Sequence, residues 1–237
     1  ADAVEVCQDR RKEKRFLAAN GLPYGPFWVI ESADDCAAVP PSAYPAILKT
    51  ARLGYDGKGQ RSVQTSDALL SAWESLGRVP CVLEKRLGLA AELSVVLARG
   101  VDGTAEAFPP GENVHRNGIL DTTTAPASLP EAIRVQALDV ALRLAAALDY
   151  VGVLGVEFFY TDDGLLTVNE MAPRPHNSGH HTIDACSVSQ FEQQVRALCA
   201  LPLAPVRTHS LAVMNNLLGD LWFAADGTRR EPEWERL

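Results

Sequence analysis

The sequence predicts an α+β fold in which antiparallel strands are grouped together and do not alternate strictly with helices. Segments rich in β-branched residues follow one another at short intervals. The pair Asp163-Gly164 favours a tight hairpin turn between two of them. A long amphipathic pattern at residues 128–152 predicts the main helix. The sequence contains no internal repeat, low-complexity tract or obvious linker.

The first half of the chain predicts short elements in close succession. Asp9 suits the N-cap of a helix that Asn20-Gly21 ends. Further on, Ser66 suits the start of a helix that continues to residue 77. Around these we expect strands at 23–30, 45–51, 59–65 and 79–85, with a helical turn or two at 31–38.

The second half predicts a larger sheet and the longest helix. Strands are expected at 90–100, 104–109, 118–124, 153–161, 165–171 and 210–219, and a helix at 187–201. The helix at 128–152 should be capped by Ser128. Its apolar stripe should consist of Ile133, Leu138, Leu142, Ala145 and Leu148. Residues 172–182 should form an irregular loop, and the polar end at 226–237 should be only partly ordered.

Composition describes an ordinary globular protein and excludes several classes. Of 237 residues, 47% are apolar and 22% charged. The formal charge of −8 argues against a nucleic-acid surface. No apolar run approaches the roughly 18 residues of a membrane span, and the first residues lack a signal-peptide core. We therefore expect a cytoplasmic protein. The cysteines are odd in number and scattered, which favours reduced thiols over disulfides or a zinc site: Cys7, Cys36, Cys81, Cys186 and Cys199.

Two glutamates should face each other across the hairpin at residues 156–170. A two-residue turn at Asp163-Gly164 places Glu157 opposite Glu170, on one face with Phe159 and Val168. Opposed like charges destabilise a sheet, and a divalent cation such as Mg²⁺ removes the conflict. The alternative is a solvated hairpin with two exposed glutamates, and a one-residue slip in register would break the pairing.

The loop "PRPHNSGHH" at residues 173–181 follows directly. Arg174 and three histidines surround Asn177 and Ser178, with little apolar content. Such a polar loop is typical of a binding site and suits an anionic organic substrate. A zinc site is the alternative, although no cysteine ligand lies nearby; its ligands would be His176, His180 and His181.

The stretch "GYDGKGQ" at residues 54–60 follows an apolar strand that ends near Lys49. A lone buried ammonium is costly without an anion, and phosphate would supply one. The glycines let backbone N–H groups point at phosphate, and Lys58 adds charge. The P-loop and Rossmann patterns are absent, and a plain hairpin turn is the alternative.

Two further candidate sites have alternative interpretations when the residues are considered alone. Residues 82–87, "VLEKRL", can offer backbone groups to a purine, with Glu92 on a ribose, or can be an exposed strand end. His115 reads as a lone histidine in a surface loop.

These segments together resemble the ATP-grasp superfamily and, within it, the N5-carboxyaminoimidazole ribonucleotide synthases, a family often called PurK. The resemblance covers most of the chain, through residues 9–23, 48–60, 83–96, 155–182, 189–203 and 214–220. Its most specific part is "NEMAPRPHNSGH" at 169–180. Other ATP-grasp enzymes tend to carry asparagine where this chain has Ala172. The formate-dependent glycinamide ribonucleotide transformylases typically continue after "PRPH" with Asp-Thr-Gly, unlike Asn177-Ser178-Gly179.

The resemblance implies roles for individual residues. Arg10 and Lys49 would contact ATP phosphates, and Glu157 and Glu170 would hold Mg²⁺. Arg174 would stabilise a phosphorylated intermediate. A mobile loop would close on the phosphates, with Asp56 and Lys58 also acting in catalysis: Gly54, Tyr55, Asp56, Gly57, Lys58, Gly59 and Gln60. The rest of the ATP site would comprise Glu84, Lys85, Arg86 and Leu87 on adenine, Glu92 on the ribose, and His115 and Asn169. The ribonucleotide pocket would be lined by His176, Asn177, Ser178, Gly179 and His180.

The implied reaction is ATP-dependent. Bicarbonate is phosphorylated to carboxyphosphate, and this species, or CO₂ released from it, carboxylates the exocyclic amine of 5-aminoimidazole ribonucleotide. Phosphoryl transfer needs cations and positioned N–H groups, with no side-chain nucleophile. No Ser-His-Asp or Cys-His arrangement competes.

The resemblance also implies a domain organisation. Residues 1–204 would form the ATP-grasp domain, with a small lid at about 45–85, and residues 205–237 part of a C-terminal subdomain. Family members usually begin with a Rossmann-like domain and end with basic residues that hold the substrate phosphate, and neither has a clear match in this chain. We therefore also consider a nucleotide-binding core that is inactive alone, and a homodimer is expected from the family.

Overall fold

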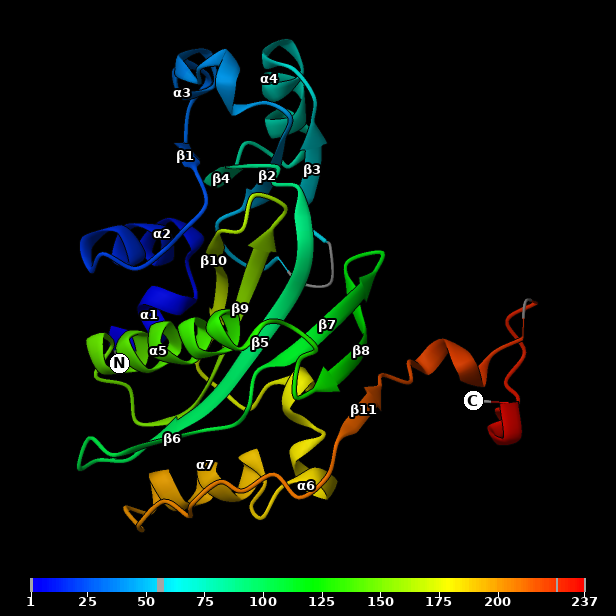
Figure 1. Ribbon diagram of the computed structural model, residues 1–237. Coiled ribbons are helices and arrows are strands. Elements are labelled where there is room, and N and C mark those ends of the chain that lie inside the picture. The colour runs from blue at the N-terminus through cyan, green and yellow to red at the C-terminus, as the bar shows by residue number, and fades with distance from the viewer. Residues whose placement is uncertain (1, 55–57, 225, 237) are drawn as a thin grey trace.

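The fold consists of two antiparallel sheets with helices packed around them (Figure 1). The computed structural model describes residues 2–54, 58–224 and 226–236. Three residues expected in the phosphate-binding loop, Tyr55, Asp56 and Gly57, lie outside the described residues. The α+β class is confirmed.

The smaller sheet has four strands in the order β1-β4-β2-β3. Its strands are β1 (Phe27–Ile30), β2 (Ala46–Thr50), β3 (Gln60–Val63) and β4 (Cys81–Lys85). The helices α3 (Ala33–Ala38) and α4 (Ser66–Ser75) and the turn η1 (Pro41–Ala43) complete this unit. Its separate apolar core is built around Leu48, Leu69 and Leu83. Because β1 pairs with β4, this unit contains more than residues 45–85.

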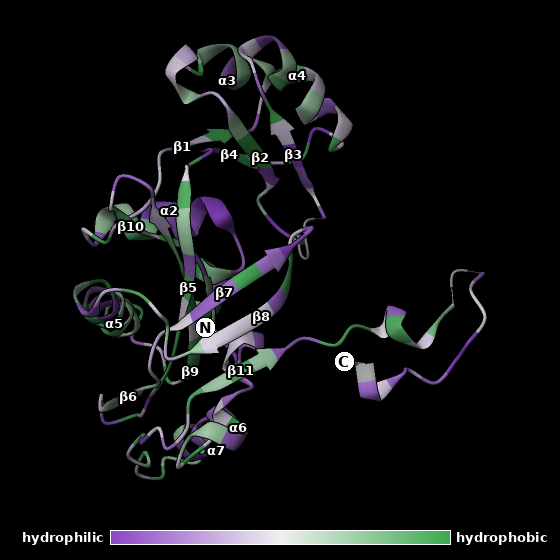
Figure 2. Cartoon of the chain, turned by 45° about the vertical axis from the view of Figure 1, so that its right-hand side comes forward, coloured by the Kyte–Doolittle hydropathy of each residue, from purple (hydrophilic) through white to green (hydrophobic). Residues whose placement is uncertain are grey.

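The larger sheet has seven strands, with the main order β10-β9-β5-β7-β8-β11 and β6 paired to β5. They are β5 (Leu89–Arg99), β6 (Ala105–Ala107), β7 (Gly111–Arg116), β8 (Ile119–Ala125), β9 (Gly152–Thr161), β10 (Leu166–Ala172) and β11 (Ala212–Asn215). The mostly apolar β11 lies at one edge, and the chain after it extends away from both sheets (Figure 2). That end contains η3 (Gly219–Trp222) and η4 (Trp234–Arg236).

Helices cover both faces of the larger sheet. α5 (Glu131–Ala147) packs on the face that carries Leu154, Val156 and Phe158. α7 (Gln190–Leu198) packs on the opposite face. The edge strand β10 is flanked by α1 (Asp2–Cys7) and α2 (Arg10–Ala19). Between β10 and α7 lie η2 (Asn177–Gly179) and α6 (Thr182–Ala185).

Most expected elements are present, but several local expectations are wrong. Asp9 caps α2 as expected, since its side chain accepts a hydrogen bond from the backbone N–H of Arg11. Ser128 does not cap α5, because the helix begins later and Pro130 occupies the N-cap position. His115 lies on β7, a strand that we did not predict because its sequence, "GENVHR", has few β-branched residues.

The expected stripe of α5 is also partly wrong. Leu142 is 37% exposed, whereas Ala145 and Leu148 are buried as expected. The buried face is instead formed by Ala137, Val140, Ala141, Leu144 and Ala145. Small alanines on this face let the helix approach the sheet closely, and the larger Leu142 is left at the margin.

In the hairpin between β9 and β10, Glu157 lies opposite Glu170 as expected, but the loop length and the register differ from those expected. Its loop has three residues, because Thr161 N donates to Leu165 O at 2.9 Å and Gly164 adopts a φ of +84°. This shifts the ladder by one residue, so Thr167 lies opposite Phe159. A bulge at Asn169 then restores Glu157 opposite Glu170. Val168 consequently points into the core, and not to the glutamate face.

The cysteines carry reduced thiols, as their number and spacing predict. All five cysteines are free thiols, and three of them are buried. Among residues 2–54, 58–224 and 226–236, no helix has the length and apolar character that crossing a membrane requires.

The corrected stripe of α5 makes a stability prediction. Leu144→Ala should lower the free energy of unfolding by about 3 kcal/mol, because it removes a fully buried side chain from the core. The control Leu142→Ala, two residues away and 37% exposed, should cost less than about 1 kcal/mol. Urea unfolding of both variants measures the difference. Equal losses would contradict the assignment of the buried face.

Candidate active site between the two sheets

A cavity of about 880 Å³ lies between the two sheets. Residues of both sheets and of the loop after β10 line it. Thr50 of β2, Ile119 of β8 and Phe159 of β9 are among them. Most of the expected site residues are brought together there: Arg10, Lys49, Gly54, Lys58, Gly59, Gln60, Arg86, Glu92, His115, Glu157, Asn169, Glu170, Arg174, His176 and Asn177.

Some expected residues do not line this cavity. Lys85 ends β4, and its backbone N–H donates to Pro26 O at 3.0 Å. Arg86, which does line the cavity, follows in the connection to β5, and its backbone N–H donates to Pro45 O at 2.9 Å. Among the described residues, the expected site residues that do not line the cavity are Glu84, Lys85, Leu87, Ser178, Gly179 and His180.

The pair Glu157–Glu170 forms the acidic centre of the cavity. Glu170 Oε2 accepts a hydrogen bond from Arg10 Nη2 at 2.8 Å. Glu157 Oε2 accepts one from Asn169 Nδ2 at 3.3 Å, and Glu157 Oε1 lies 3.5 Å from His176 Nε2. Burial and then the charge of Glu170 raise the pKa of Glu157 to about 7. Burial by itself would raise the pKa of Glu170. The charge of Arg10 and its hydrogen bond outweigh burial, so the pKa of Glu170 is lowered.

Two carboxylates in this arrangement fit Mg²⁺. The ion prefers hard oxygen ligands and commonly uses one or two carboxylates together with phosphates. A cation between Glu157 and Glu170 would relieve the repulsion that raises the pKa of Glu157. Glu157 and Glu170 are therefore the residues that would hold it.

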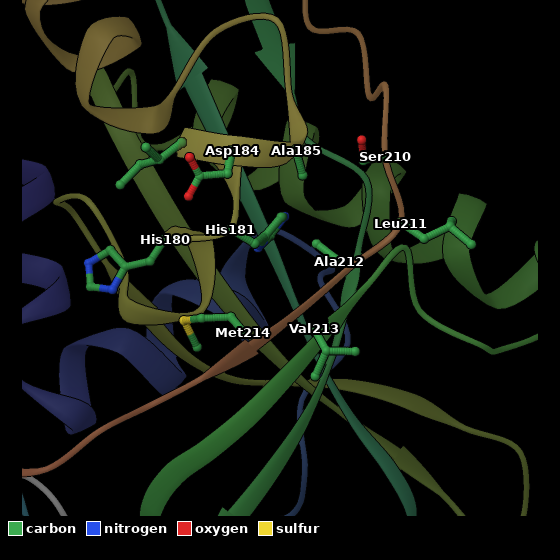
Figure 3. Close-up of a pocket in the computed structure, with 10 residues that line it drawn as sticks. His180, His181, Asp184, Ala185, Ser210, Leu211, Ala212, Val213 and Met214 are labelled. Atoms are coloured by element: carbon green, nitrogen blue, oxygen red, sulfur yellow. The ribbon is translucent and has the colours of Figure 1, made fainter. Parts of the chain in front are cut away.

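The histidines considered for zinc do not converge. His176 Nδ1 lies 2.8 Å from Ser178 Oγ, and His181 Nδ1 lies 2.8 Å from Ser178 O. The exposed His180 ring stacks on Phe191. Figure 3 shows the His180 side chain turned away from that of His181, beside a second cavity of about 440 Å³. Within the described part of the chain, no group of three or more histidine, cysteine, aspartate or glutamate residues is placed to hold a metal ion.

Lys49 and Lys14 share one glutamate, Glu84, whose side chain is 12% exposed. Lys49 Nζ lies 3.1 Å from Glu84 Oε2, and Lys14 Nζ lies 3.7 Å from the same atom. Burial lowers the pKa of Lys49, and Glu84 opposes that shift. Burial would raise the pKa of Glu84, but Lys49 and Lys14 together bring it well below its ordinary value. The anion that Lys49 requires is therefore present in the protein itself, while Lys49 still lines the cavity.

On the opposite wall, Glu92 and His115 form a pair. Glu92 lies on β5 and His115 on the neighbouring strand β7, so that Glu92 Oε2 lies 2.9 Å from His115 Nδ1. The Glu92 carboxylate raises the pKa of His115 against the opposing effect of burial. The pair therefore presents a polar surface to the cavity, as a ribose would require.

Glycines and Gln190 hold the loop that carries His176. A Cβ at Gly155 would lie 2.7 Å from the Cβ of His176, so only glycine allows this approach. Gln190 accepts from His176 N at 2.8 Å and donates to His176 O at 2.7 Å. Burial and the nearby Arg174 lower the pKa of His176 to about 4. His176 is therefore a neutral, fixed imidazole.

Sequence reasoning missed Lys14, Glu13 and Gln190. Lys14 and Leu17 are both buried on α2, and Lys14 follows Arg10 by four residues, so both face the same side of the helix. That spacing is the signal that could have identified Lys14. Gln190 carries no comparable signal, because its partner His176 lies fourteen residues away in the sequence.

The comparisons with known proteins agree with this geometry. A family model of the ATP-grasp domain matches residues 15–191. The chain belongs to the ATP-grasp family. It is 43% identical over 221 residues to the N5-carboxyaminoimidazole ribonucleotide synthase of Bacillus subtilis (strain 168), covering 93% of this chain and 58% of that protein.

Two solved structures support the same relationship. An ADP complex of the N5-carboxyaminoimidazole ribonucleotide synthetase PurK is 38% identical, with a TM-score of 0.88, and the match covers 93% of this chain and 59% of that one. The Aspergillus clavatus N5-carboxyaminoimidazole synthase with ADP and 5-aminoimidazole ribonucleotide is 29% identical, with a TM-score of 0.83, covering 94% and 59%. This chain therefore spans about three fifths of the length of these relatives.

The carboxylate pair predicts a metal-dependent change. Glu157→Gln and Glu170→Gln should each weaken Mg²⁺-dependent ATP binding by more than about tenfold, because each removes a charged oxygen ligand. Isothermal titration with ATP, with and without Mg²⁺, measures this. Glu74→Gln, in an exposed ion pair with Arg78, serves as the control and should bind like the unmodified chain. Unchanged binding in both site variants would refute the metal assignment.

Glu13 predicts a dependence of stability on pH. Its side chain is buried, and Oε1 has no hydrogen-bond partner among the described residues. Burial raises its pKa to about 7, against the opposing charges of Lys14 and Arg10. The folded chain therefore binds a proton that the unfolded chain releases above its ordinary pKa of 4.5. The stability contributed by protonated Glu13 is fully present below that value and is lost as the pH rises through about 7.

The neutral variant Glu13→Gln should therefore gain stability relative to the unmodified chain between pH 5.5 and 8.5, by roughly 1–3 kcal/mol. Urea unfolding at both pH values measures the gain. Glu5→Gln is the control, because Glu5 is exposed and its pKa is lowered by Lys12, outside this interval. A difference between Glu13→Gln and the unmodified chain that is the same at both pH values would show that Glu13 does not titrate there.

Proposed function

We propose that the chain binds Mg²⁺-ATP between its two sheets and supplies the nucleotide site of an N5-carboxyaminoimidazole ribonucleotide synthase. The observation that carries this proposal is one cavity that joins Glu157 and Glu170 with Lys49 and with the loop at 174–177. The names of the relatives support the same activity. In this proposal the protein acts in the cytoplasm and as a homodimer.

In this proposal, Arg10 and Lys49 hold the phosphates of ATP, and Lys58 and the backbone at Gly59 cover them. Bound Mg²⁺, held by Glu157 and Glu170, supplies charge neutralisation on the phosphates. Glu92 and His115 contact the ribose. A bicarbonate oxygen attacks the γ-phosphorus, and the bond to ADP breaks. No protein nucleophile is needed, because these side chains position the reactants and stabilise charge.

The second step takes place beside the loop at 174–177. The exocyclic amine of 5-aminoimidazole ribonucleotide attacks the carboxyl carbon of carboxyphosphate, or CO₂ released from it. Phosphate leaves, and the amine loses a proton. Arg174 would stabilise the anionic intermediate, and its side chain is exposed toward the cavity. The neutral His176 and Asn177 would orient the acceptor, since an imidazole fixed at Nδ1 presents Nε2 in one direction.

A second candidate function is a nucleotide-binding module without carboxylation by this chain alone. The observation that favours it is the partial coverage of the relatives, 58% and 59%. A ligase with another acceptor, such as a formate-dependent glycinamide ribonucleotide transformylase, is a weaker candidate because of Asn177 and Ser178.

ADP release tests the proposal. The purified chain is given ATP, Mg²⁺ and bicarbonate, with and without 5-aminoimidazole ribonucleotide. We expect the ribonucleotide to raise the rate of ADP release by about tenfold or more, because the acceptor consumes carboxyphosphate. Glu157→Gln should abolish this stimulation.

The alternatives give different results in the same assay. ATP binding without stimulation would support the nucleotide-binding module. Stimulation by formate and glycinamide ribonucleotide in place of bicarbonate and aminoimidazole ribonucleotide would support the transformylase. No nucleotide binding would refute all three functions.

A further inference from the structure

Lys14 is a buried cation at the back of the cavity. It lies on α2, and only 1% of its side chain is exposed. Its Nζ donates to the carbonyl oxygen of Asn169 at 2.9 Å and lies 3.5 Å from that of Val168. The same atom lies 3.7 Å from Glu84 Oε2. A buried ammonium costs several kcal/mol unless it is paired and hydrogen-bonded, so these partners are needed to keep it there.

The two carbonyls belong to the bulge in β10. Val168 pairs with Phe158, and Glu170 pairs with Glu157, so Asn169 is the extra residue. In an uninterrupted ladder, Glu170 would take the place opposite Val156, which points into the core. The bulge is therefore what brings Glu170 to the cavity face.

The bulge is held from outside the ladder. β10 is an edge strand, so only β9 pairs with it along its length. On the free edge, the backbone N–H of Val168 donates to Pro23 O at 3.0 Å. Lys14 then binds the carbonyls of Val168 and Asn169. Helix α2 and the segment after it thus contact Val168 and the extra residue Asn169.

Lys14 also joins the bulge to the smaller sheet. Glu84, at the end of β4, lies between Lys14 and Lys49. Glu84 Oε1 is buried without a hydrogen-bond partner among the described residues, and Oε2 is the oxygen that contacts both lysines. The position of Lys14 is therefore coupled to the lysine that faces the cavity from β2.

We propose that Lys14 is a positioning residue of the metal site: its ammonium holds the bulge at Val168–Asn169 and thereby keeps Glu170 opposite Glu157. Lys14 itself would not touch the metal or the nucleotide, since it is not among the described residues that line the cavity. The inference rests on the proposed function, because it concerns the carboxylates that hold Mg²⁺ there.

Lys14→Met tests this inference, because it keeps the length of the side chain and removes its charge. Mn²⁺ serves as the probe, and its binding to the ADP-bound chain is followed by electron paramagnetic resonance. We expect the affinity for Mn²⁺ to fall by about tenfold or more, as for other residues that orient metal ligands, while ADP affinity without metal changes less than about threefold. Lys12→Met is the matched control, since Lys12 lies on the same helix but is exposed and pairs with Glu5.

A double-mutant cycle with Glu170→Gln separates positioning from general destabilisation. If Lys14 acts through Glu170, Lys14→Met should weaken Mn²⁺ binding little further in the Glu170→Gln background. Fully additive losses, an unchanged Mn²⁺ affinity, or an equal loss of metal-free ADP binding would each overturn the inference. Lys14→Gln keeps a neutral donor and provides the same comparison if Lys14→Met does not fold.

The assay distinguishes this inference from the proposed function. An unmodified chain that binds Mn²⁺ with ADP but shows no ribonucleotide-stimulated turnover would count against carboxylation alone. An unmodified chain that binds no Mn²⁺ with ADP would overturn both.

Discussion

Glu157 and Glu170 face each other across the β9–β10 ladder, and the surrounding structure depends on this pairing of like charges. Opposed carboxylates destabilise a sheet, and burial makes their repulsion stronger. The protein offsets the repulsion unequally. Arg10 pairs with Glu170 and lowers its pKa, whereas the pKa of Glu157 rises to about 7. One carboxylate is thus stabilised as an anion, and the other is left with a demand for a cation.

The positive side of the site is assembled from both sheets. Lys49 comes from β2 of the smaller sheet, and Arg10 and Lys14 come from the helix beside β10. Glu84 keeps the two lysines together although they are mutually repulsive. Because the cavity needs side chains from each sheet, neither sheet alone contains the site. This explains why the cavity lies between the two sheets.

Close backbone approach matters as much as charge. Gly155 lets the ring of His176 lie directly against β9, where any Cβ would collide with it. Gly179 similarly leaves room for the amide of Gln190, which hydrogen-bonds the backbone of His176 on both sides. The loop therefore has a defined position although it contains little regular structure. Polar groups on such a loop can orient a substrate because the scaffold underneath is rigid.

The sequence by itself determined the α+β class, most element positions and the cap at Asp9, because these follow from local propensity and period. It also predicted that Glu157 faces Glu170, but from a two-residue turn, whereas a bulge produces this pairing in the structure. It also identified most residues of the cavity, although the three-residue hairpin loop and the compensating bulge were not foreseen. Only the tertiary structure decided that Glu84 turns to two lysines, that His180 lies outside the cavity, and that Leu142 is exposed on α5. It also brought Lys14 to the bulge, 155 residues away in the sequence. Local patterns describe a residue and its near neighbours, whereas these contacts depend on how separate elements pack, and no short sequence window contains that information.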